Sequence, residues 1–160
     1  MEQVQKETML FAEKIGAKFL PLRKLKSFFE FNGVGLIIKV SRDGKEFWGI
    51  DNTLVDLELK NKKYACIFLE TENRGWFCTR EHFELGKGKK WKKGGDNDDY
   101  KVNGNHLEKE WYFTDIQMFL NMFYKYLDNK SIVVRHSRQA RASLAGSPCA
   151  PRSRSTGRVR

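Results

Sequence analysis

The sequence predicts an α+β fold in which an antiparallel or mixed β-meander of four to six strands carries an N-terminal and a C-terminal helix. Between residues 36 and 83, short apolar runs alternate with turn residues, a pattern typical of consecutive strands. Residues 3–15 and 115–127 instead place apolar side chains at helical spacing. Because an apolar stripe needs a partner, both helices are expected to pack on the sheet.

The strands are indicated by turns and by alternation. Asp43-Gly44 between two apolar runs is a typical hairpin signal, and residues 72–75 supply a second turn. Residues 54–60 alternate apolar and charged side chains, which predicts a strand with one buried and one solvated face. The expected strands are residues 36–40, 46–51, 54–60, 64–70, 76–79 and 100–102.

Helix signals lie mainly at the two ends of this region. Apolar residues after Pro21 predict a short helix within residues 19–31, followed by a turn at Asn32-Gly33. Thr79 is expected to cap a single helical turn. Thr114 and Gln117 have the spacing of a capping box, in which each side chain satisfies a free backbone N–H of the other.

The charge distribution separates the chain into a body and a tail. The 160 residues carry a net charge of +10. Residues 131–160 contain seven Arg and no Asp or Glu, which leaves +3 for residues 1–130. We therefore expect a single domain over residues 1–130 and a disordered Arg/Ser-rich tail over residues 131–160, which an artificial or read-through extension would also explain.

The cysteines and the hydropathy favour a soluble, cytoplasmic protein. Cys66, Cys78 and Cys149 form no CxxC pair and no zinc-binding spacing, and a reducing compartment suits them. The sequence shows no signal-peptide pattern and no apolar run of membrane-spanning length, so no membrane partner is expected. Walker, GxGxxG and nucleophile-elbow motifs are also missing, which disfavours an ATPase, a dinucleotide enzyme and a serine hydrolase.

Asp51, Glu58 and Lys60 are the candidate catalytic residues. Two carboxylates with a lysine two residues after the second resemble the signature of the PD-(D/E)xK nucleases, the restriction-endonuclease-like superfamily; the local match covers residues 50–61. The resemblance implies a metal-dependent endonuclease in which Asp51 and Glu58 bind Mg²⁺ while Lys60 steadies the attacking water or the developing charge. Strand alternation would place Glu58 and Lys60 on one face. The alternative is an ordinary strand whose charged side chains face water.

A loop over residues 86–95 is the candidate nucleic-acid-binding segment. It sets five Lys around one Trp and frames them with four Gly, which predicts an exposed, mobile loop. Lysine binds phosphate and tryptophan can stack on a base, so contact with nucleic acid, DNA rather than RNA, is one interpretation; a merely solvated loop is the other. The candidate contacts are Lys87, Lys89, Lys90, Trp91, Lys92 and Lys93.

Three functions are compatible with these patterns. The first is a metal-dependent endonuclease that hydrolyses phosphodiester bonds, and the second is a nucleic-acid-binding module without catalysis. The third is a small protein-interaction or inhibitor domain, which would use an exposed edge strand or an aromatic patch. A homodimer is a further option for its assembly.

Overall fold

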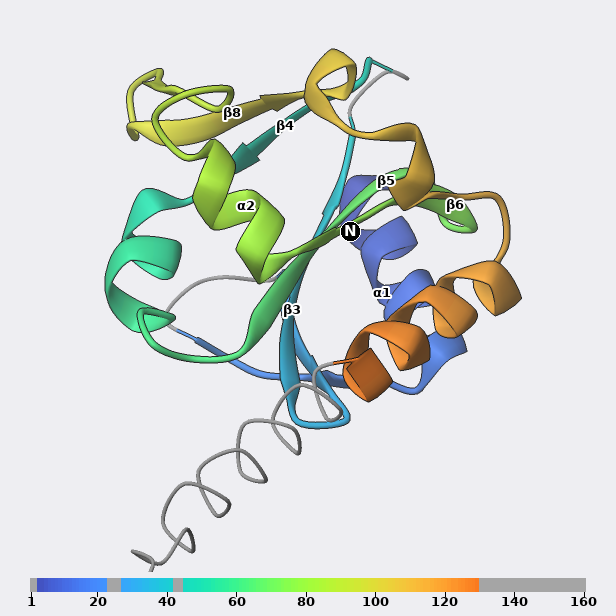
Figure 1. Cartoon of the computed structure of the whole chain (residues 1–160). Coiled ribbons are helices and arrows are strands. Elements are labelled where there is room, and N and C mark those ends of the chain that lie inside the picture. The colour runs from blue at the N-terminus through green and yellow to red at the C-terminus, as the bar shows by residue number, and fades with distance from the viewer. Residues whose placement is uncertain (1–2, 23–26, 42–44, 130–160) are drawn as a thin grey trace, which may run out of the picture. The chain divides into compact units, whose positions relative to one another are not determined.

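The computed structural model describes residues 3–22, 27–41 and 45–129 (Figure 1). Contacts divide the chain into one unit that ends at Met122 and a second that begins at Phe123, inside the last helix. The expected tail over residues 131–160 and the Asp43-Gly44 turn lie outside the described residues. The elements are α1 (Gln3–Ile15), β1 (Lys18–Phe19), β2 (Phe28–Phe31), β3 (Val34–Val40), β4 (Phe47–Ile50), the π-helix η2 (Leu54–Glu58), β5 (Tyr64–Thr71), β6 (Arg74–Thr79), α2 (Arg80–Gly86), β7 (Lys93–Gly94), β8 (Asp99–Asn103), the 3₁₀ helices η3 (Gly104–His106) and η4 (Lys109–Trp111), β9 (Tyr112–Phe113) and a helix over residues 116–129.

The main sheet is mixed and has six strands in the order β1-β2-β3-β5-β6-β9. Strands β3 and β5 run parallel, whereas their neighbours pair antiparallel. The predicted α+β class, with a mixed sheet and a helix near each end, is confirmed. A simple meander from β3 to β5 is wrong, because parallel neighbours require a long crossover, here formed by residues 41–63.

Strand β4 belongs to a second, three-stranded sheet in the order β4-β8-β7. Its partner is β8, with Trp48 opposite Val102 and Ile50 opposite Tyr100. The predicted strands over residues 46–51 and 100–102 therefore exist, but they pair with each other and not with the main sheet.

The strand predicted over residues 54–60 is wrong, because this segment is helical over residues 52–58. The side chain of Asp51 accepts the N–H of Leu54 at 2.9 Å, which satisfies a free donor of the first turn. Alternation would have buried Leu57, yet Leu57 is 68% exposed. The helix ends at Glu58, and in the turn that follows Asn61 has a φ of 67°, in the left-handed region that asparagine tolerates better than most residues.

The helix predicted within residues 19–31 is also wrong, since residues 28–31 form β2. Strand β2 pairs with β3 in a tight hairpin in which Phe31 lies opposite Val34. The expected turn at Asn32-Gly33 is present, and both residues have positive φ (50° and 80°) as a two-residue hairpin turn with a compatible twist requires.

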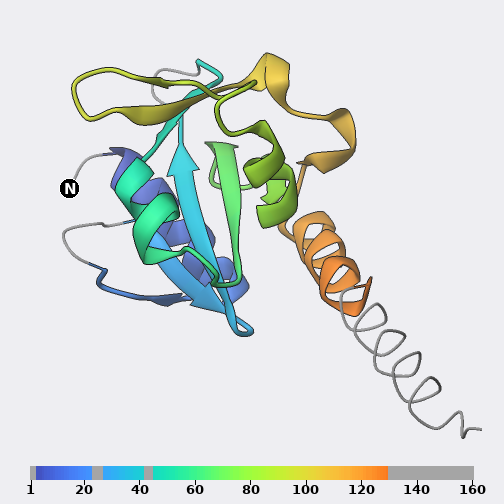
Figure 2. The same cartoon turned by 60° about the vertical axis from the view of Figure 1, so that its left-hand side comes forward.

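Each face of the main sheet carries its own apolar layer. On one face, the rings of Phe11 from α1, Phe113 from β9 and Phe119 from the last helix contact one another with centroids 5.2–5.9 Å apart. The other face carries a cluster that includes Phe28, Cys66 and Cys78 together with residues of β4, the 52–58 helix and α2. In both views α1 and the 52–58 helix lie on opposite sides of the sheet (Figure 1, Figure 2).

The helix ends follow the predictions in part. The Thr79 hydroxyl accepts the N–H of His82 at 3.3 Å, so the predicted cap of α2 is confirmed. At the last helix the side chain of Asp115 accepts the N–H of Met118 at 2.8 Å, while Gln117 bonds forward to Asn121 at 3.0 Å. The cap is thus Asp115 and not the predicted capping box. No helix within the described ranges is long and apolar enough to span a bilayer.

Candidate functional site

The structure gives Asp51 a local structural role. Its Oδ1 accepts the Leu54 N–H and its carbonyl oxygen accepts the Val55 N–H at 3.3 Å, so both acceptors serve the start of the 52–58 helix. Such caps contribute about 1 kcal/mol to stability. The sequence signal for this role was present, because Asp is one of the preferred residues immediately before a helix.

Glu58 and Lys60 do not share the face of a strand, because Glu58 ends the π-helix and Lys60 lies in the exposed turn that follows. Asp51 precedes the first turn of the helix and Glu58 ends it, so the two carboxylates come from opposite ends of the helix. The strand that was expected to place Glu58 and Lys60 on one face is therefore wrong, and the catalytic role of Asp51, Glu58 and Lys60 stays a prediction. Among the described residues, no three His, Cys, Asp or Glu side chains form a group that could hold a metal ion.

Trp91 is buried rather than exposed, with 1% of its surface accessible. Its ring stacks on Phe83 with centroids 5.1 Å apart and planes 16° apart. Gly86 makes room for it, because a Cβ at this position would collide with the Trp91 ring. The expectation of an exposed tryptophan that stacks on a base is wrong, since Trp91 belongs to the apolar cluster of the sheet.

The lysines around Trp91 fall into two groups. Three are paired with acids: Lys87 and Lys93 with Asp56, at 2.7 and 3.6 Å, and Lys90 with Glu108 at 3.5 Å. Lys89 and Lys92 are exposed. Phosphate binding by this loop thus stays a prediction, and Lys89 and Lys92 are the lysines best placed to serve it.

Asp56 lies at the centre of a polar network that fastens the 52–58 helix to this loop. Its Oδ1 lies 2.7 Å from Lys87 Nζ, and its Oδ2 accepts the hydroxyl of Tyr100 at 2.7 Å. Lys87 also pairs with Glu84 at 2.7 Å, and Glu84 accepts the hydroxyl of Tyr64 at 2.5 Å. The network joins segments far apart in sequence, which no local pattern indicates.

The network shifts the pKa values of Asp56, Lys87 and Tyr100 toward the charge states that these groups hold. Burial acts to raise the pKa of Asp56, but hydrogen bonds from Lys87 and Tyr100 and the charges of Lys87 and Lys93 outweigh it and lower that pKa. Burial acts to lower the pKa of Lys87, whereas its bonds to Asp56 and Glu84 raise it. Burial, reinforced by the bond to Asp56, raises the pKa of Tyr100 to about 12. All of these groups therefore keep one charge state near neutral pH, which is the behaviour of a structural network.

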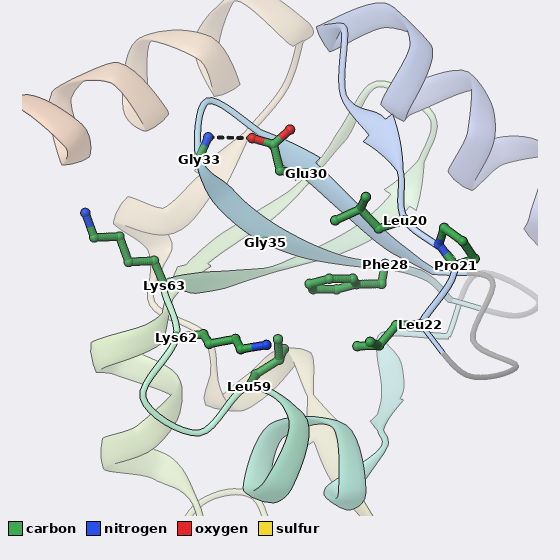
Figure 3. Close-up of a pocket in the computed structure, with 10 residues that line it drawn as sticks. All are labelled: Leu20, Pro21, Leu22, Phe28, Glu30, Gly33, Gly35, Leu59, Lys62 and Lys63. Atoms are coloured by element: carbon green, nitrogen blue, oxygen red, sulfur yellow. Dashed lines mark hydrogen bonds between the residues drawn. The ribbon is translucent and has the colours of Figure 1, made fainter.

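A pocket of about 550 Å³ opens at the β1–β2 edge of the main sheet (Figure 3). Leu20, Leu22 and Phe28 line it from the sheet edge, and Leu59 and Lys62 line it from the turn after the 52–58 helix. Its floor depends on Gly35, because a Cβ there would lie 2.6–2.8 Å from two ring atoms of Phe28. This volume is within the range of small-ligand and side-chain pockets.

Of the polar side chains that line this pocket, Glu30 forms a hydrogen bond within the protein and the two lysines are exposed. Glu30 accepts the N–H of Gly33 at 2.6 Å and so belongs to the β2–β3 turn. Lys62 and Lys63 are both exposed. In Figure 3 the Lys62 side chain extends across the pocket toward the apolar side chains, whereas Lys63 points away from it. Lys62 is therefore the cationic group best placed to meet an occupant.

A second hollow of about 320 Å³ lies beside α2. The ring of His82 stacks on Trp111 at 4.4 Å, and Lys90 pairs with Glu108 across the lining. Lys90 and Glu108 thus engage each other, and Glu110 adds a further carboxylate to the lining.

The sequence did not indicate the pocket at β1. Its walls come from residues 20–22, β2, β3 and the turn over residues 59–63. Two of these segments have a secondary structure other than the predicted one. In addition, the parallel pairing of β3 with β5 brings the turn over residues 59–63 beside the β2–β3 hairpin. No family model, curated protein or solved structure matches the chain.

Proposed function

We propose that the chain is a non-catalytic protein-interaction domain that seats an apolar side chain of a partner polypeptide in the pocket at β1. The observation that carries this proposal is an apolar pocket placed directly beside the outermost strand of the main sheet. Of the three functions considered from the sequence, this is the one whose expected surface has a counterpart in the described geometry.

The edge strand supports a polypeptide as the occupant. The N–H of Leu20 donates to the Phe28 carbonyl at 3.0 Å, and Lys18 lies opposite Glu30. Because pairing groups alternate along an antiparallel strand, Phe19 turns its own N–H and C=O away from β2. An extended partner segment can bond to this edge while one of its side chains enters the pocket. Pro21 limits that pairing to a short stretch, since proline has no N–H to donate.

The exposed surface near the pocket has the character of an anchor site. Leu20, on the pocket side of β1, keeps 39% of its surface accessible. Interfaces concentrate their binding energy in a few apolar or aromatic anchors that fill such pockets. A partner that covers Leu20 and fills the space above Phe28 thus gains most of its binding free energy here from buried apolar surface.

Selection of a random peptide library on the full chain tests the proposal. We expect the enriched peptides to share an apolar residue and to shift the backbone NMR signals of β1, Gly35 and residues 59–63. Leu20→Ser should weaken them about tenfold, because it removes apolar contact worth roughly 1–2 kcal/mol. The matched control is Leu57→Ser, at a side chain that is 68% exposed and does not line the pocket.

A second pair of variants tests whether peptide binding needs the space inside the pocket, independently of the contact with Leu20. Gly35→Ala displaces the Phe28 ring and should reduce peptide binding, whereas Gly94→Ala meets its nearest neighbour at an ordinary 3.7 Å and should not. Both changes remove the same backbone freedom from the unfolded chain. Peptides that map to another surface, or that bind Leu20→Ser as well as the parent, would contradict the proposal.

Cleavage and nucleic-acid binding stay predictions that a direct assay decides. When plasmid or single-stranded DNA is incubated with the chain and Mg²⁺, the proposal above expects intact DNA from the parent and from Glu58→Ala and Lys60→Ala. Cleavage by the parent that is lost in both variants would establish the endonuclease instead. Binding that weakens with added salt and disappears in a Lys89→Ala, Lys92→Ala double variant would establish the nucleic-acid-binding module.

A further inference from the structure

Lys62 gives the pocket at β1 a charge preference. Its side chain crosses the apolar pocket, and its ammonium group has no ion pair among the described residues (Figure 3). We propose that the partner segment is acidic: an Asp or Glu beside the apolar anchor pairs with Lys62 when the anchor enters the pocket. This inference rests on the proposed function, which it makes more specific by naming the chemistry of the partner.

The backbone around Lys62 is held in place from both sides. The N–H of Lys62 donates to the Leu59 carbonyl at 3.0 Å, and the carbonyl of Lys63 accepts the N–H of Gly35 at 3.0 Å. The Leu59 N–H in turn donates to the Leu54 carbonyl at 2.8 Å, so the turn that carries Lys62 is tied to the 52–58 helix at one end and to β3 at the other. An ammonium group on a fixed turn loses less freedom on pairing than one on a mobile segment.

The other lysines near the pocket act in the same direction. Lys63 lines the rim and Lys18 lies on the edge strand, so both add positive potential where a partner would approach. The acid at the rim is Glu30, and its carboxylate already accepts the Gly33 N–H. Electrostatic complementarity of this kind selects anionic partners and speeds their association.

The competing explanation is that Lys62 only covers apolar surface with its methylene stem and keeps its charge in water. Lys62→Met separates the two, because methionine preserves a long apolar side chain and removes the charge. Lys60→Met is the matched control, since Lys60 lies in the same turn, is exposed and does not line the pocket. The Arg-rich segment over residues 131–160 is the same in all variants, so any attraction it has for acidic peptides cancels in the comparison.

The experiment uses three short, end-blocked peptides with a central Leu-Val-Leu anchor followed by a pair of Glu, Gln or Lys. We expect the Glu peptide to bind the parent about fivefold more tightly than the Gln peptide, and the Lys peptide to bind more weakly still. The preference for Glu should shrink in Lys62→Met, persist in Lys60→Met and decrease as salt is added.

The outcomes separate this inference from the function on which it rests. If all three peptides bind the parent equally and Leu20→Ser weakens all of them, the interaction site stands and the acidic partner is overturned. A Glu preference that survives in Lys62→Met also overturns the role of Lys62. If none of the peptides binds, or Leu20→Ser leaves the binding of all of them unchanged, both the site and its charge preference are wrong.

Discussion

Trp91→Ala is expected to lower the free energy of unfolding by about 4 kcal/mol, the range found when a fully buried large aromatic side chain is removed. The Trp91 ring is 1% exposed, stacks on Phe83 and fills the space over Gly86. Its backbone N–H also bonds to the Gly86 carbonyl at 3.1 Å, so the ring and its loop are fixed together. Urea denaturation followed by far-UV circular dichroism measures the change.

Trp91→Phe is the matched variant for this experiment, because it keeps an aromatic ring against Phe83 and should cost about half as much. Lys89→Ala, on the exposed side of the same loop, should change stability by no more than about 0.5 kcal/mol. A Trp91→Ala protein that unfolds at the parent's urea midpoint would contradict the buried position. If such a protein also lost DNA binding, the role predicted from the sequence would be restored.

The loop around Trp91 shows why charge patterns in a sequence can mislead. Five lysines in ten residues predicted exposure, but burial is decided side chain by side chain. The lysines extend outward or pair with Asp56 and Glu108, while Trp91 turns inward against α2. Gly86 makes this packing feasible, because a Cβ at this position would collide with the Trp91 ring, whereas in a sequence the same glycine indicates flexibility.

The strands of the main sheet were predictable where both of their faces are buried. In β5, residues 64–69 are buried without exception, and β-branched and aromatic side chains indicate such a strand independently of its neighbours. The prediction for residues 54–60 failed because the segment contains both patterns: Val55, Leu57 and Leu59 alternate as in a strand, but Leu54, Val55 and Leu59 are the ones that the helix and its turn bury. The residue that distinguishes the two patterns is Asp51, because Asp favours the start of a helix and its side chain accepts the Leu54 N–H there.

The candidate site was beyond prediction because it depends on topology. The pocket requires the 59–63 turn to return beside the β2–β3 hairpin, which follows from the parallel pairing of Gly35 with Tyr64 and of Leu36 with Ala65. A parallel pair joined through a crossover leaves no local trace in the sequence. The residues that line the pocket are ordinary ones, and only their convergence makes them a site.

Asp56→Ala is expected to lower the free energy of unfolding by about 2–3 kcal/mol at pH 7. The change removes the acceptor of Tyr100 and a close partner of Lys87, each at 2.7 Å, and charged hydrogen bonds of this kind contribute about 1.5–3 kcal/mol. The larger loss of stability found when one partner of a fully buried ion pair is removed is not expected here. The side chains of Lys87 and Asp56 keep 19% and 30% of their surface accessible. Asp96→Ala, at an exposed carboxylate, is the control and should stay within about 0.5 kcal/mol.

The pH dependence of this difference identifies its origin. The pKa of Asp56 is lowered in the folded protein, so its stabilising contribution is complete above its ordinary value of 3.8 and is lost as the pH falls through the folded value. The pKa values of Lys87 and Tyr100 are raised in the folded protein, that of Tyr100 to about 12. The stabilisation from these two groups is therefore complete below their ordinary pKa values near 10, and it is lost as the pH rises through their pKa values in the folded protein. Urea titrations of the parent and Asp56→Ala should therefore differ most between about pH 5 and 9 and converge in acid. A difference that stayed constant down to pH 2 would show that Asp56 acts through packing alone, and the 52–58 helix would then be held to the lysine-rich loop by apolar contact and not by charge.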